Sequence, residues 1–402
     1  MNIKPSLSVI RADSVQEGLV LQLQVPGGEH HKNMALPNTY AYSPLINSHD
    51  HLIGNWVPRA GDKRPYPNSH YWVEDMKHSF SFKERNRFWV NDGSFQLSEP
   101  EAIQLAALGC YKSLFSGCSI VHDHAPLQED SYYDQMPLLV VRHYRQCHSI
   151  TLGNWWGGRT AREEMKLTTG RIPFIIHLGE GVDEVTKAEF SELTKEGLLQ
   201  PNTLLIHGIA FSRKEIERTA KAGASICWCP TSNYYLIGKT LNINAALAAG
   251  VNVCLGTDST MSGGINLIDE FLKIRETHPA ISARTMYQMC TANAARALML
   301  PAQYASLDPE HTSNLLLVEA MDKDPFENLL DLDASTIDLL VLDGIPRYGN
   351  SEWLEILSLN EDDYTVFRTG HKEKFVLGDP QQINDRIDAA LGYHKDFPYL
   401  PF

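Results

Sequence analysis

Short apolar runs alternate with segments of helical periodicity between Leu45 and Thr257. This alternation is typical of a parallel α/β fold, because such strands are buried on both faces by the helices that connect them. A closed (β/α)8 barrel needs eight strands. Pro137–Val141 is the candidate for an eighth strand, although Leu138–Tyr144 also has the pattern of a helix. Seven other runs have the length of a buried strand: Leu45–Ser48, Cys118–His122, Ser149–Gly153, Pro173–His177, Thr203–His207, Ala224–Cys229 and Asn252–Thr257.

The two ends of the chain are rich in strand patterns instead. Gly18–Val25 alternates as a strand does, and β-like runs follow much later at Ile337–Leu342, Tyr364–Phe367 and Phe375–Leu377. We therefore predict an α/β protein with a distorted TIM-type (β/α)8 barrel over residues 45–300. Residues 1–44 and 301–402 would together form a small β-sandwich. A chain of 402 residues has room for one barrel of about 250 residues and a modest second unit.

The composition argues against several classes of partner. A formal net charge of −14 disfavours nucleic acid and anionic membranes, because both bind basic surfaces. We find neither a signal-peptide pattern at the start nor a run approaching about 18 apolar residues, so we expect no membrane partner. The seven cysteines are odd in number and lie mostly in apolar runs, which favours free thiols in a reducing cytoplasm. We expect a small-molecule substrate, and a homo-oligomer stays open.

Histidines and carboxylates lie at the ends of the predicted strands. His49 and His51 are two residues apart, so both rings point to one face of their strand and can chelate a metal. His177 and Asp258 end two later strands, and the C-terminal strand ends of a barrel carry its active site. Three imidazoles and one carboxylate give three or four ligands and leave a position for water. Zinc and ferrous iron both fit this set, and cobalt and manganese fit it less well.

Two neighbours of these residues have the chemistry of proton transfer. Glu180 lies three residues after His177, where it could take a proton from the metal-bound water and give it to a leaving nitrogen. The alternative is a charge that interacts with a helix N-terminus. His207 could be a further ligand or could hydrogen-bond the attacking water, and we favour the second role. Asp258 could act as a ligand and also as a base towards the metal-bound water.

The predicted pocket is formed by loops at the strand ends, because such loops shape binding sites. The long segment Leu52–Leu97 is rich in aromatic residues and would cover the strand ends. Its content favours a flat, partly apolar substrate held by stacking, although the same residues could form a packed rim. In a second His-x-His motif we interpret His122 as structural. The remaining substrate contacts are assigned to His124, Trp155, Trp156 and Asn233.

In these stretches the chain resembles the amidohydrolase superfamily, and within it the branch of cytosine, guanine and adenosine-type deaminases and triazine hydrolases. The resemblance implies one divalent metal with the ligands His49, His51, His177 and Asp258. It also implies that Glu180 and His207 are catalytic groups beside this metal. Ala305–Asn314 lacks the glycines, lysine and closing aspartate of the corresponding family passage, so a substrate is not carried over. The resemblance covers about Leu45–Leu300 and rests on His49-Asp-His51, His177-Leu-Gly-Glu180, Leu205-Ile-His207-Gly208, Cys229-Pro-Thr-Ser-Asn233 and Leu255-Gly-Thr-Asp258-Ser259.

These features predict a metal-dependent hydrolase that attacks an sp² carbon–nitrogen bond with metal-bound hydroxide. Hydrolytic deamination of an aminated heterocycle is the first interpretation. Cleavage of a cyclic amide, or of another C–N or C–Cl bond, is the alternative within the superfamily. A metal-binding partner protein without catalysis is the alternative of another class, and the presence of Glu180 beside the ligand set argues against it.

Overall fold

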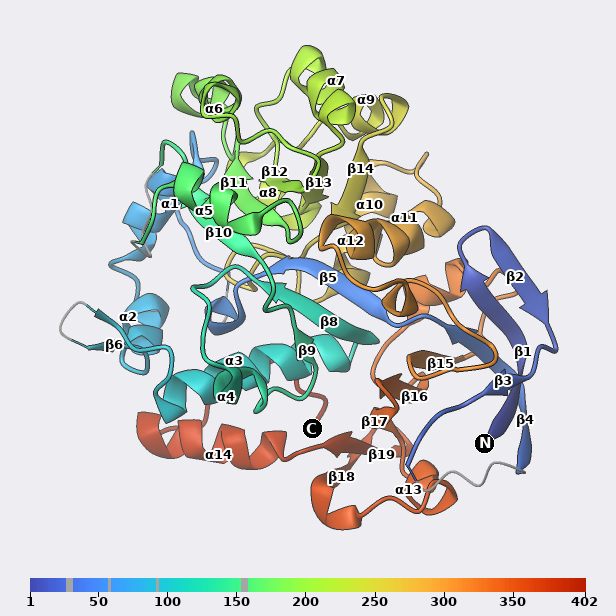
Figure 1. Ribbon diagram of the computed structural model, residues 1–402. Coiled ribbons are helices and arrows are strands. Elements are labelled where there is room, and N and C mark those ends of the chain that lie inside the picture. Colours follow the sequence, from blue (N-terminus) through green and yellow to red (C-terminus); the bar gives the residue numbers. More distant parts are fainter. Residues whose placement is uncertain (27–31, 57–58, 92–93, 153–157) are drawn as a thin grey trace.

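The computed structural model describes residues 1–26, 32–56, 59–91, 94–152 and 158–402. Its parallel strands lie at the centre and are flanked by helices, and a mixed sheet lies at the lower right of Figure 1. None of the helices in the described ranges is long and apolar enough to cross a membrane.

Two parallel sheets carry the strands predicted between residues 45 and 257. The smaller sheet has the order β5 (Leu45–Asp50), β8 (Cys118–Asp123), β9 (Leu139–Val140). The larger has the order β10 (Arg145–Ser149), β11 (Phe174–Leu178), β12 (Thr203–His207), β13 (Ser225–Trp228), β14 (Asn252–Leu255). Strands β14 and β5 lie side by side, which brings one edge of each sheet together. These strands are buried along their whole length except at the start of β9 and β10, as the continuous apolar runs predict.

The sequence-based prediction was wrong about the bounds of one strand. The strand expected at Ser149–Gly153 is β10, which begins at Arg145 and ends at Ser149. Its polar first residues, Arg145 and Gln146, are half-buried at the sheet edge and conceal the strand pattern in the sequence. The eighth strand, in contrast, is confirmed as the short β9, and the helical alternative for that segment is wrong.

Helices follow most strands and cover the parallel sheets. Ser212 begins α7 with a capping box, in which its side chain accepts from the Glu215 N–H and the Glu215 carboxylate accepts from the Ser212 N–H. The helices from α3 to α12 are α3 (Pro100–Leu114), α4 (Asp130–Tyr133), α5 (Ala161–Thr168), α6 (Glu184–Lys195), α7 (Arg213–Ala222), α8 (Pro230–Ile237), α9 (Ile243–Ala248), α10 (Leu267–Thr277), α11 (Ala283–Met289) and α12 (Ala292–Ala297).

The long segment after β5 contains ordered elements of its own. It contains α1 (Ser69–Met76), α2 (Phe80–Asn86) and a hairpin of β6 (Val90–Asn91) and β7 (Ser94–Phe95). These elements lie at the left of Figure 1, beside the strand ends. Near them, α14 (Pro380–Leu391), close to the end of the chain, packs on α3.

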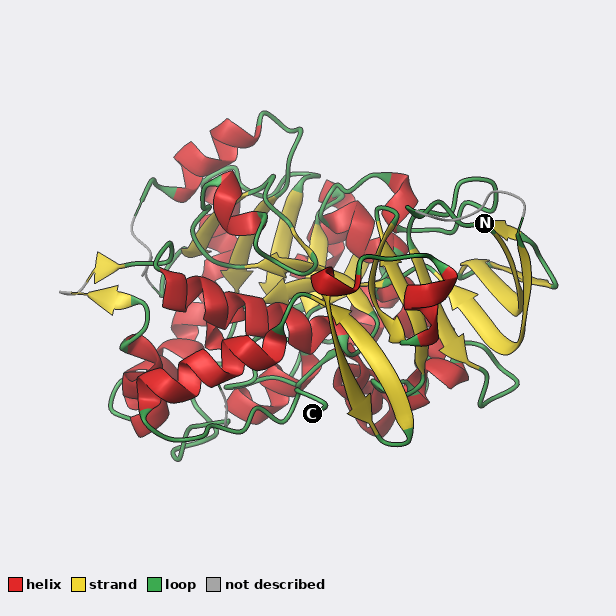
Figure 2. Ribbon diagram, turned by 90° about the horizontal axis from the view of Figure 1, so that it is seen from below, coloured by secondary structure: helices red, strands yellow, loops and turns green. Residues whose placement is uncertain are grey.

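Strands from both ends of the chain form one nine-stranded sheet, which is seen from below in Figure 2. Its two halves join where β4 pairs antiparallel with β15. Apolar side chains of both halves, with Trp353 of α13 (Glu352–Ile356), form a separate core cluster. The β-sandwich form of this unit stays a prediction. The sheet has the order β18 (Tyr364–Thr369), β19 (Lys372–Leu377), β17 (Ile345–Asn350), β16 (Ile337–Leu342), β15 (Leu315–Glu319), β4 (Asn33–Tyr42), β1 (Asn2–Arg11), β2 (Ser14–Glu17), with β3 (Leu21–Gln22) also paired to β1.

Candidate active site

The carboxyl ends of the parallel strands bring distant residues together. His49 is in β5, His177 is in β11, and Asp258 follows β14. The backbone N–H of Asp258 donates to the carbonyl of His49 at 3.1 Å, so the first and last of these strands meet at the site. His49 has no exposed surface, and His177 and Asp258 are buried.

Four side chains converge with donor atoms at metal-ligand spacing. His177 Nε2 lies 3.3 Å from His49 Nε2. Asp258 Oδ1 lies 3.7 Å from His49 Nε2 and 3.5 Å from His51 Nε2. A tetrahedral ion with bonds of about 2.0–2.1 Å holds its ligand atoms about 3.3–3.4 Å apart. The four side chains therefore fit a divalent ion between them.

Hydrogen bonds to the backbone and to hydroxyls orient these donors. His177 Nδ1 lies 2.9 Å from the carbonyl oxygen of His148, to which it donates, so Nε2 keeps its lone pair. The Asp258 Oδ2 atom accepts from the hydroxyls of Ser232 at 2.7 Å and Ser262 at 2.8 Å, while Oδ1 accepts from the Ser259 N–H. Asp258 also has a φ of 56°, in the left-handed region, where strain collects at functional sites.

The electrostatics of the cluster favour the metal-binding forms. Burial lowers the pKa of His49 and of His177 well below the usual value, and the neighbouring imidazoles lower both further. Burial also lowers the pKa of His51. For Asp258, burial raises the pKa, but His51, His207 and the serine hydroxyls lower it more. Neutral imidazoles and an ionised carboxylate are the states that coordinate a cation.

Glu180 and His207 form a pair beside the cluster. Glu180 Oε1 lies 3.4 Å from His207 Nε2, and both side chains are buried. His207 Nδ1 donates to Asn233 Oδ1 at 2.8 Å, which leaves Nε2 as the acceptor of the neutral ring. Burial raises the pKa of Glu180 to about 7, although His207 lowers it, so this carboxyl can gain or lose a proton near neutral pH. Asp258 belongs to the same group of donors.

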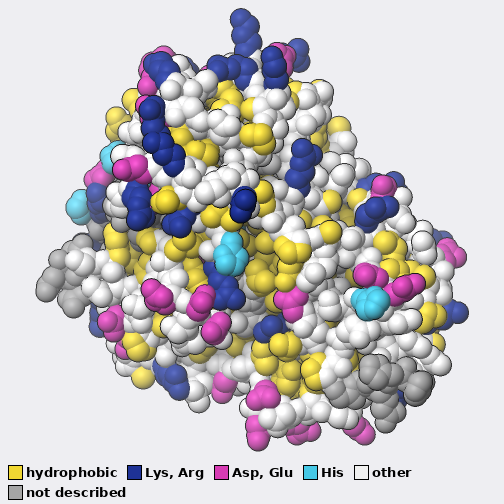
Figure 3. All heavy atoms as spheres, in the orientation of Figure 1, with side chains coloured by type: hydrophobic (Ala, Val, Ile, Leu, Met, Phe, Trp, Pro, Cys, Tyr) yellow, Lys and Arg dark blue, Asp and Glu magenta, His cyan; other side chains and the backbone are white. Residues whose placement is uncertain are grey.

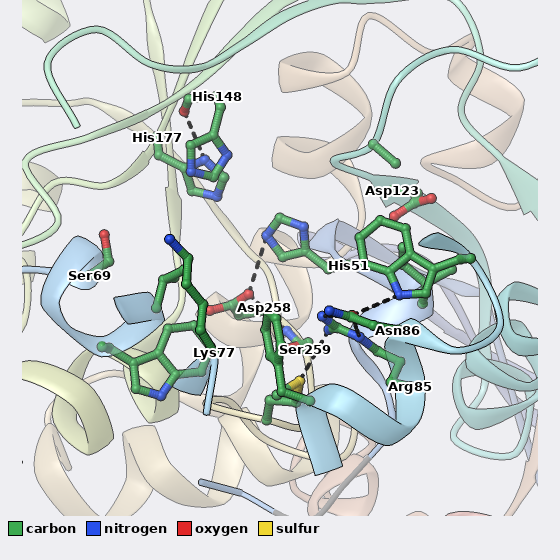
Figure 4. Close-up of a pocket in the computed structure, with 18 of the residues that line it drawn as sticks. His51, Ser69, Lys77, Arg85, Asn86, Asp123, His148, His177, Asp258 and Ser259 are labelled. Atoms are coloured by element: carbon green, nitrogen blue, oxygen red, sulfur yellow. Dashed lines mark hydrogen bonds and ion pairs between the residues drawn. The ribbon is translucent and has the colours of Figure 1, made fainter. Parts of the chain in front are cut away.

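A cavity of about 430 Å³ opens onto these residues. Figure 4 shows His51, His177 and Asp258 on one side of it and residues of the long segment after β5 on the other. The polar lining includes Glu180 and His207. The segment contributes an aromatic wall that consists of Trp72, Phe82, Trp89 and Phe95. The wall supports the prediction that this segment shapes the pocket.

The comparisons with known proteins agree with this geometry. The model of the amidohydrolase family matches residues 163–346. Over these residues the chain is similar to the amidohydrolase family. A 5-methylthioadenosine/S-adenosylhomocysteine deaminase from Thermococcus sibiricus is 33% identical over 162 residues, and one from Pyrococcus abyssi is 32% identical over 162 residues. Each of these matches covers 37% of this chain and 37% of the relative, so the chain spans little more than a third of the length of the curated relatives that it matches.

Solved structures resemble this chain over most of its length. Atrazine chlorohydrolase from Arthrobacter aurescens TC1, complexed with zinc, has a TM-score of 0.66 at 19% identity and covers 86% of this chain and 94% of its own. An adenosine deaminase from Xanthomonas campestris with bound zinc has a TM-score of 0.65 at 14% identity and covers 96% and 98%. At these identities the similarity shows a common α/β fold.

The predicted substrate contacts lie in different places. His124 is buried, and its ring stacks on His177 with centroids 4.3 Å apart, behind the cluster. Asn233 holds His207 and is fully buried. Neither residue is among those that line the cavity. Trp155 and Trp156 lie outside the described residues. The roles of all four residues as substrate contacts stay predictions.

Three site residues escaped the sequence interpretation. His148 lines the cavity at the end of β10, and the correct bounds of that strand would have revealed it as another strand-end histidine. Lys112 forms a buried ion pair with Asp50, the residue between His49 and His51, but a lone lysine in a helical pattern gives no signal. Arg85 lines the cavity from α2, and nothing in its local sequence distinguishes it from a surface arginine.

Proposed function

We propose that this protein is a metal-dependent amidohydrolase that hydrolytically deaminates an aminated heterocycle. The observation that carries the proposal is the convergence of three imidazoles and Asp258 beside the Glu180–His207 pair, at the wall of one cavity. A metal-binding protein without catalysis would not need a buried carboxyl whose pKa lies near 7 next to its ligands.

We assign one divalent metal to His49, His51, His177 and Asp258. Zinc is favoured over iron because three imidazole nitrogens and one carboxylate oxygen suit a tetrahedral ion, and because the two similar structures carry zinc. The bound ion would lower the pKa of a coordinated water and so provide the nucleophile at neutral pH.

The side chains around the nucleophile then divide the proton transfers. Glu180 takes a proton from the attacking water and delivers it to the ring or leaving nitrogen, which requires a pKa near the working pH. His207, aligned by Asn233, accepts a hydrogen bond from the same water at Nε2 and fixes its direction of attack. Three donors, the hydroxyls of Ser232 and Ser262 and the N–H of Ser259, hold the Asp258 carboxylate in place. This carboxylate can accept a proton in the same step.

A flat ring suits the cavity. The aromatic wall favours stacking. We assign substrate specificity to His124, Trp155 and Trp156, whereas Asn233, also predicted as a substrate contact, acts through His207. The relatives named as adenosine-derivative deaminases make an aminopurine the first choice. Cleavage of a C–Cl bond or of a cyclic amide is the second candidate, because a chlorohydrolase shares the fold.

The same reasoning extends to the architecture and the partners. We infer a distorted (β/α)8 barrel over residues 45–300, supported by the two parallel sheets that meet between β14 and β5, and a composite unit of residues 1–44 and 301–402. We infer a cytoplasmic protein with a small-molecule substrate and no nucleic-acid partner, with homo-oligomers left open. The absence of a nucleic-acid partner is inferred from the net charge of −14 and from the face in Figure 3, over which acidic and basic side chains are both spread.

A substrate panel tests this function. Zinc-loaded protein is incubated with aminated purines, pyrimidines, pterins and triazines, and released ammonia is measured, with chloride measured for chlorotriazines. We expect ammonia from at least one aminated ring and none after the zinc is removed. Chloride release without ammonia would assign the second candidate instead. Zinc binding without turnover across the panel would favour the metal-binding protein.

A further inference from the structure

Arg85 is a buried cation in the wall of the cavity. It lies in α2 and is 6% exposed. Figure 4 shows it among the residues that line this cavity, which also include His51 and Asp258. The arginine and the proposed metal ligands His51, His177 and Asp258 therefore line the same cavity.

The contacts of Arg85 are neutral. Its guanidinium donates to Asn86 Oδ1 at 3.1 Å and to Met261 Sδ at 3.4 Å. It also lies over the rings of Phe82, 4.2 Å from the centroid, and Trp89, 5.1 Å from the centroid. Among the described residues no carboxylate forms an ion pair with it, although its neighbour Glu84 forms one with Lys395.

An uncompensated guanidinium is costly inside a protein. Burying a charge without an opposite charge is strongly unfavourable, and buried arginines are therefore normally paired. Burial alone lowers the pKa of Arg85 to about 9, with no acidic group to offset the effect. A guanidinium in this position presents a planar fork of donors that matches a carboxylate.

Resting on the function proposed above, we propose that Arg85 binds a carboxylate on the substrate, at the end of the molecule away from the reacting carbon. A single carboxylate balances the one charge of Arg85, whereas a phosphate dianion would leave excess charge beside Phe82 and Trp89. Lys77 does not supply a second free charge, because its amine forms an ion pair with Glu74 at 2.5 Å. The cavity of about 430 Å³ has room for a ring with a short acidic side chain.

Matched acid and amide ligands test this assignment. The probes are adenines that carry at N9 a carboxymethyl, 2-carboxyethyl or 3-carboxypropyl group, each with its primary amide as the neutral partner of equal shape. Dissociation constants for zinc-loaded protein are measured by calorimetry, and ammonia release is measured in parallel. We expect at least one acid to bind roughly 10–100-fold more tightly than its amide, the range for a charge-assisted hydrogen bond.

Variants separate the contact from general effects on the fold. In Arg85→Met the acid-to-amide ratio should fall to within about 3-fold of one, and in Arg85→Lys it should recover in part, because the charge returns without the fork. Arg284→Met is the matched control, since Arg284 is exposed and also lies over an aromatic ring, that of Phe326. Its ratio should equal that of the unmodified protein. Metal-free Arg85→Met should unfold at no lower temperature than the unmodified protein.

The outcomes for the two proposals are distinguishable. Tighter binding of an acid that depends on Arg85 supports the carboxylate site even where no ammonia is released, and the absence of ammonia would then count against the deamination of aminopurines. Equal binding of every acid and its amide, or a preference that persists in Arg85→Met, overturns the carboxylate site and leaves the deaminase proposal intact. Failure of all six probes to bind also overturns it.

Discussion

The Asn233 side chain aligns His207 through one hydrogen bond. Its Oδ1 atom accepts from His207 Nδ1 at 2.8 Å, and its Nδ2 atom donates to Thr240 Oγ1 at 3.0 Å. Replacing it by alanine should lower kcat by about 10–100-fold, the usual loss for a group that orients a catalytic histidine, while KM changes little. Steady-state kinetics on the deaminated substrate check this. Asn233→Asp, which keeps the acceptor, should lose less. A raised KM at unchanged kcat would instead make Asn233 a substrate contact.

In the proposed mechanism, Glu180 transfers the proton from the attacking water to the leaving nitrogen. Glu180→Gln keeps the shape of the side chain but removes its acid–base function, so turnover should fall by about 10²–10⁴-fold. The zinc content and zinc affinity should stay within a few-fold of the unmodified protein, because Glu180 is not among the four proposed ligands. Full activity of the variant on the same substrate would show that another group moves the proton.

The raised pKa of Glu180 also has a thermodynamic consequence in metal-free protein. Burial raises the folded-state pKa from about 4.5 to about 7, so folding favours the protonated carboxyl. The stability that this proton contributes is complete below pH 4.5 and is lost as the pH rises to 7, a change of about 3 kcal/mol. Urea unfolding between pH 4.5 and 8 should therefore show this decline in the unmodified protein. In Glu180→Gln the decline should be smaller, and identical pH curves would place Glu180 in a solvated environment.

At the scale of elements, an ion pair joins β5 to α3. Lys112 Nζ donates to Asp50 Oδ2 at 2.7 Å, and neither side chain has exposed surface. Asp50 also accepts from Asn47, Asn55 and Thr257, so the network reaches the loop after β14. His49 and His51, on either side of Asp50, are thereby held against the loop that carries Asp258.

Breaking this ion pair should destabilise the folded protein. Lys112→Met leaves a buried carboxylate without its cation and should lower the free energy of unfolding by about 3–5 kcal/mol. Urea unfolding of metal-free protein measures the loss. The double variant Asp50→Asn/Lys112→Met should be less destabilised than the sum of its single variants, because the two residues interact directly. Additive losses would show that the two side chains act independently.

The strands and the convergence of the strand-end side chains could be predicted because apolar runs followed by a polar residue leave a strong local signal. His49, His177 and Asp258 follow this rule. The start of β10 at Arg145 does not follow this rule, because half-buried polar residues interrupt its apolar pattern. Arg85 gave no signal either, since its burial depends on the packing of α2 over the strand ends, and that packing is a property of the tertiary structure.

At the scale of the whole molecule, the final residues of the chain support the pocket wall. Lys395 Nζ lies 2.7 Å from Glu84 Oε2, beside Arg85 on α2, and the hydroxyl of Tyr399 donates to the carbonyl of Asn55 at 2.9 Å. Phe397 and Tyr399 are both buried. These contacts connect the end of the chain to the segment that follows β5.

Removal of residues 393–402 should therefore loosen that segment. Loss of two buried aromatic side chains should lower the free energy of unfolding by roughly 3–6 kcal/mol. Limited proteolysis should cut the truncated protein within residues 77–91 faster than the full chain. Tyr399→Phe, which removes only one hydrogen bond, is the control and should cost about 1 kcal/mol. Equal cleavage rates in the full and truncated chains would show that α2 is held by other contacts.

The proposed deamination of a heterocycle depends on one metal ion together with the Glu180–His207 pair. Its most direct test is a titration of metal-free protein with zinc, in which ammonia release from the best substrate of the panel is measured at each step. Activity should rise in proportion to added zinc and level off at one equivalent per chain. Activity that is independent of zinc, or that levels off only at two equivalents, would rule out this single-metal mechanism.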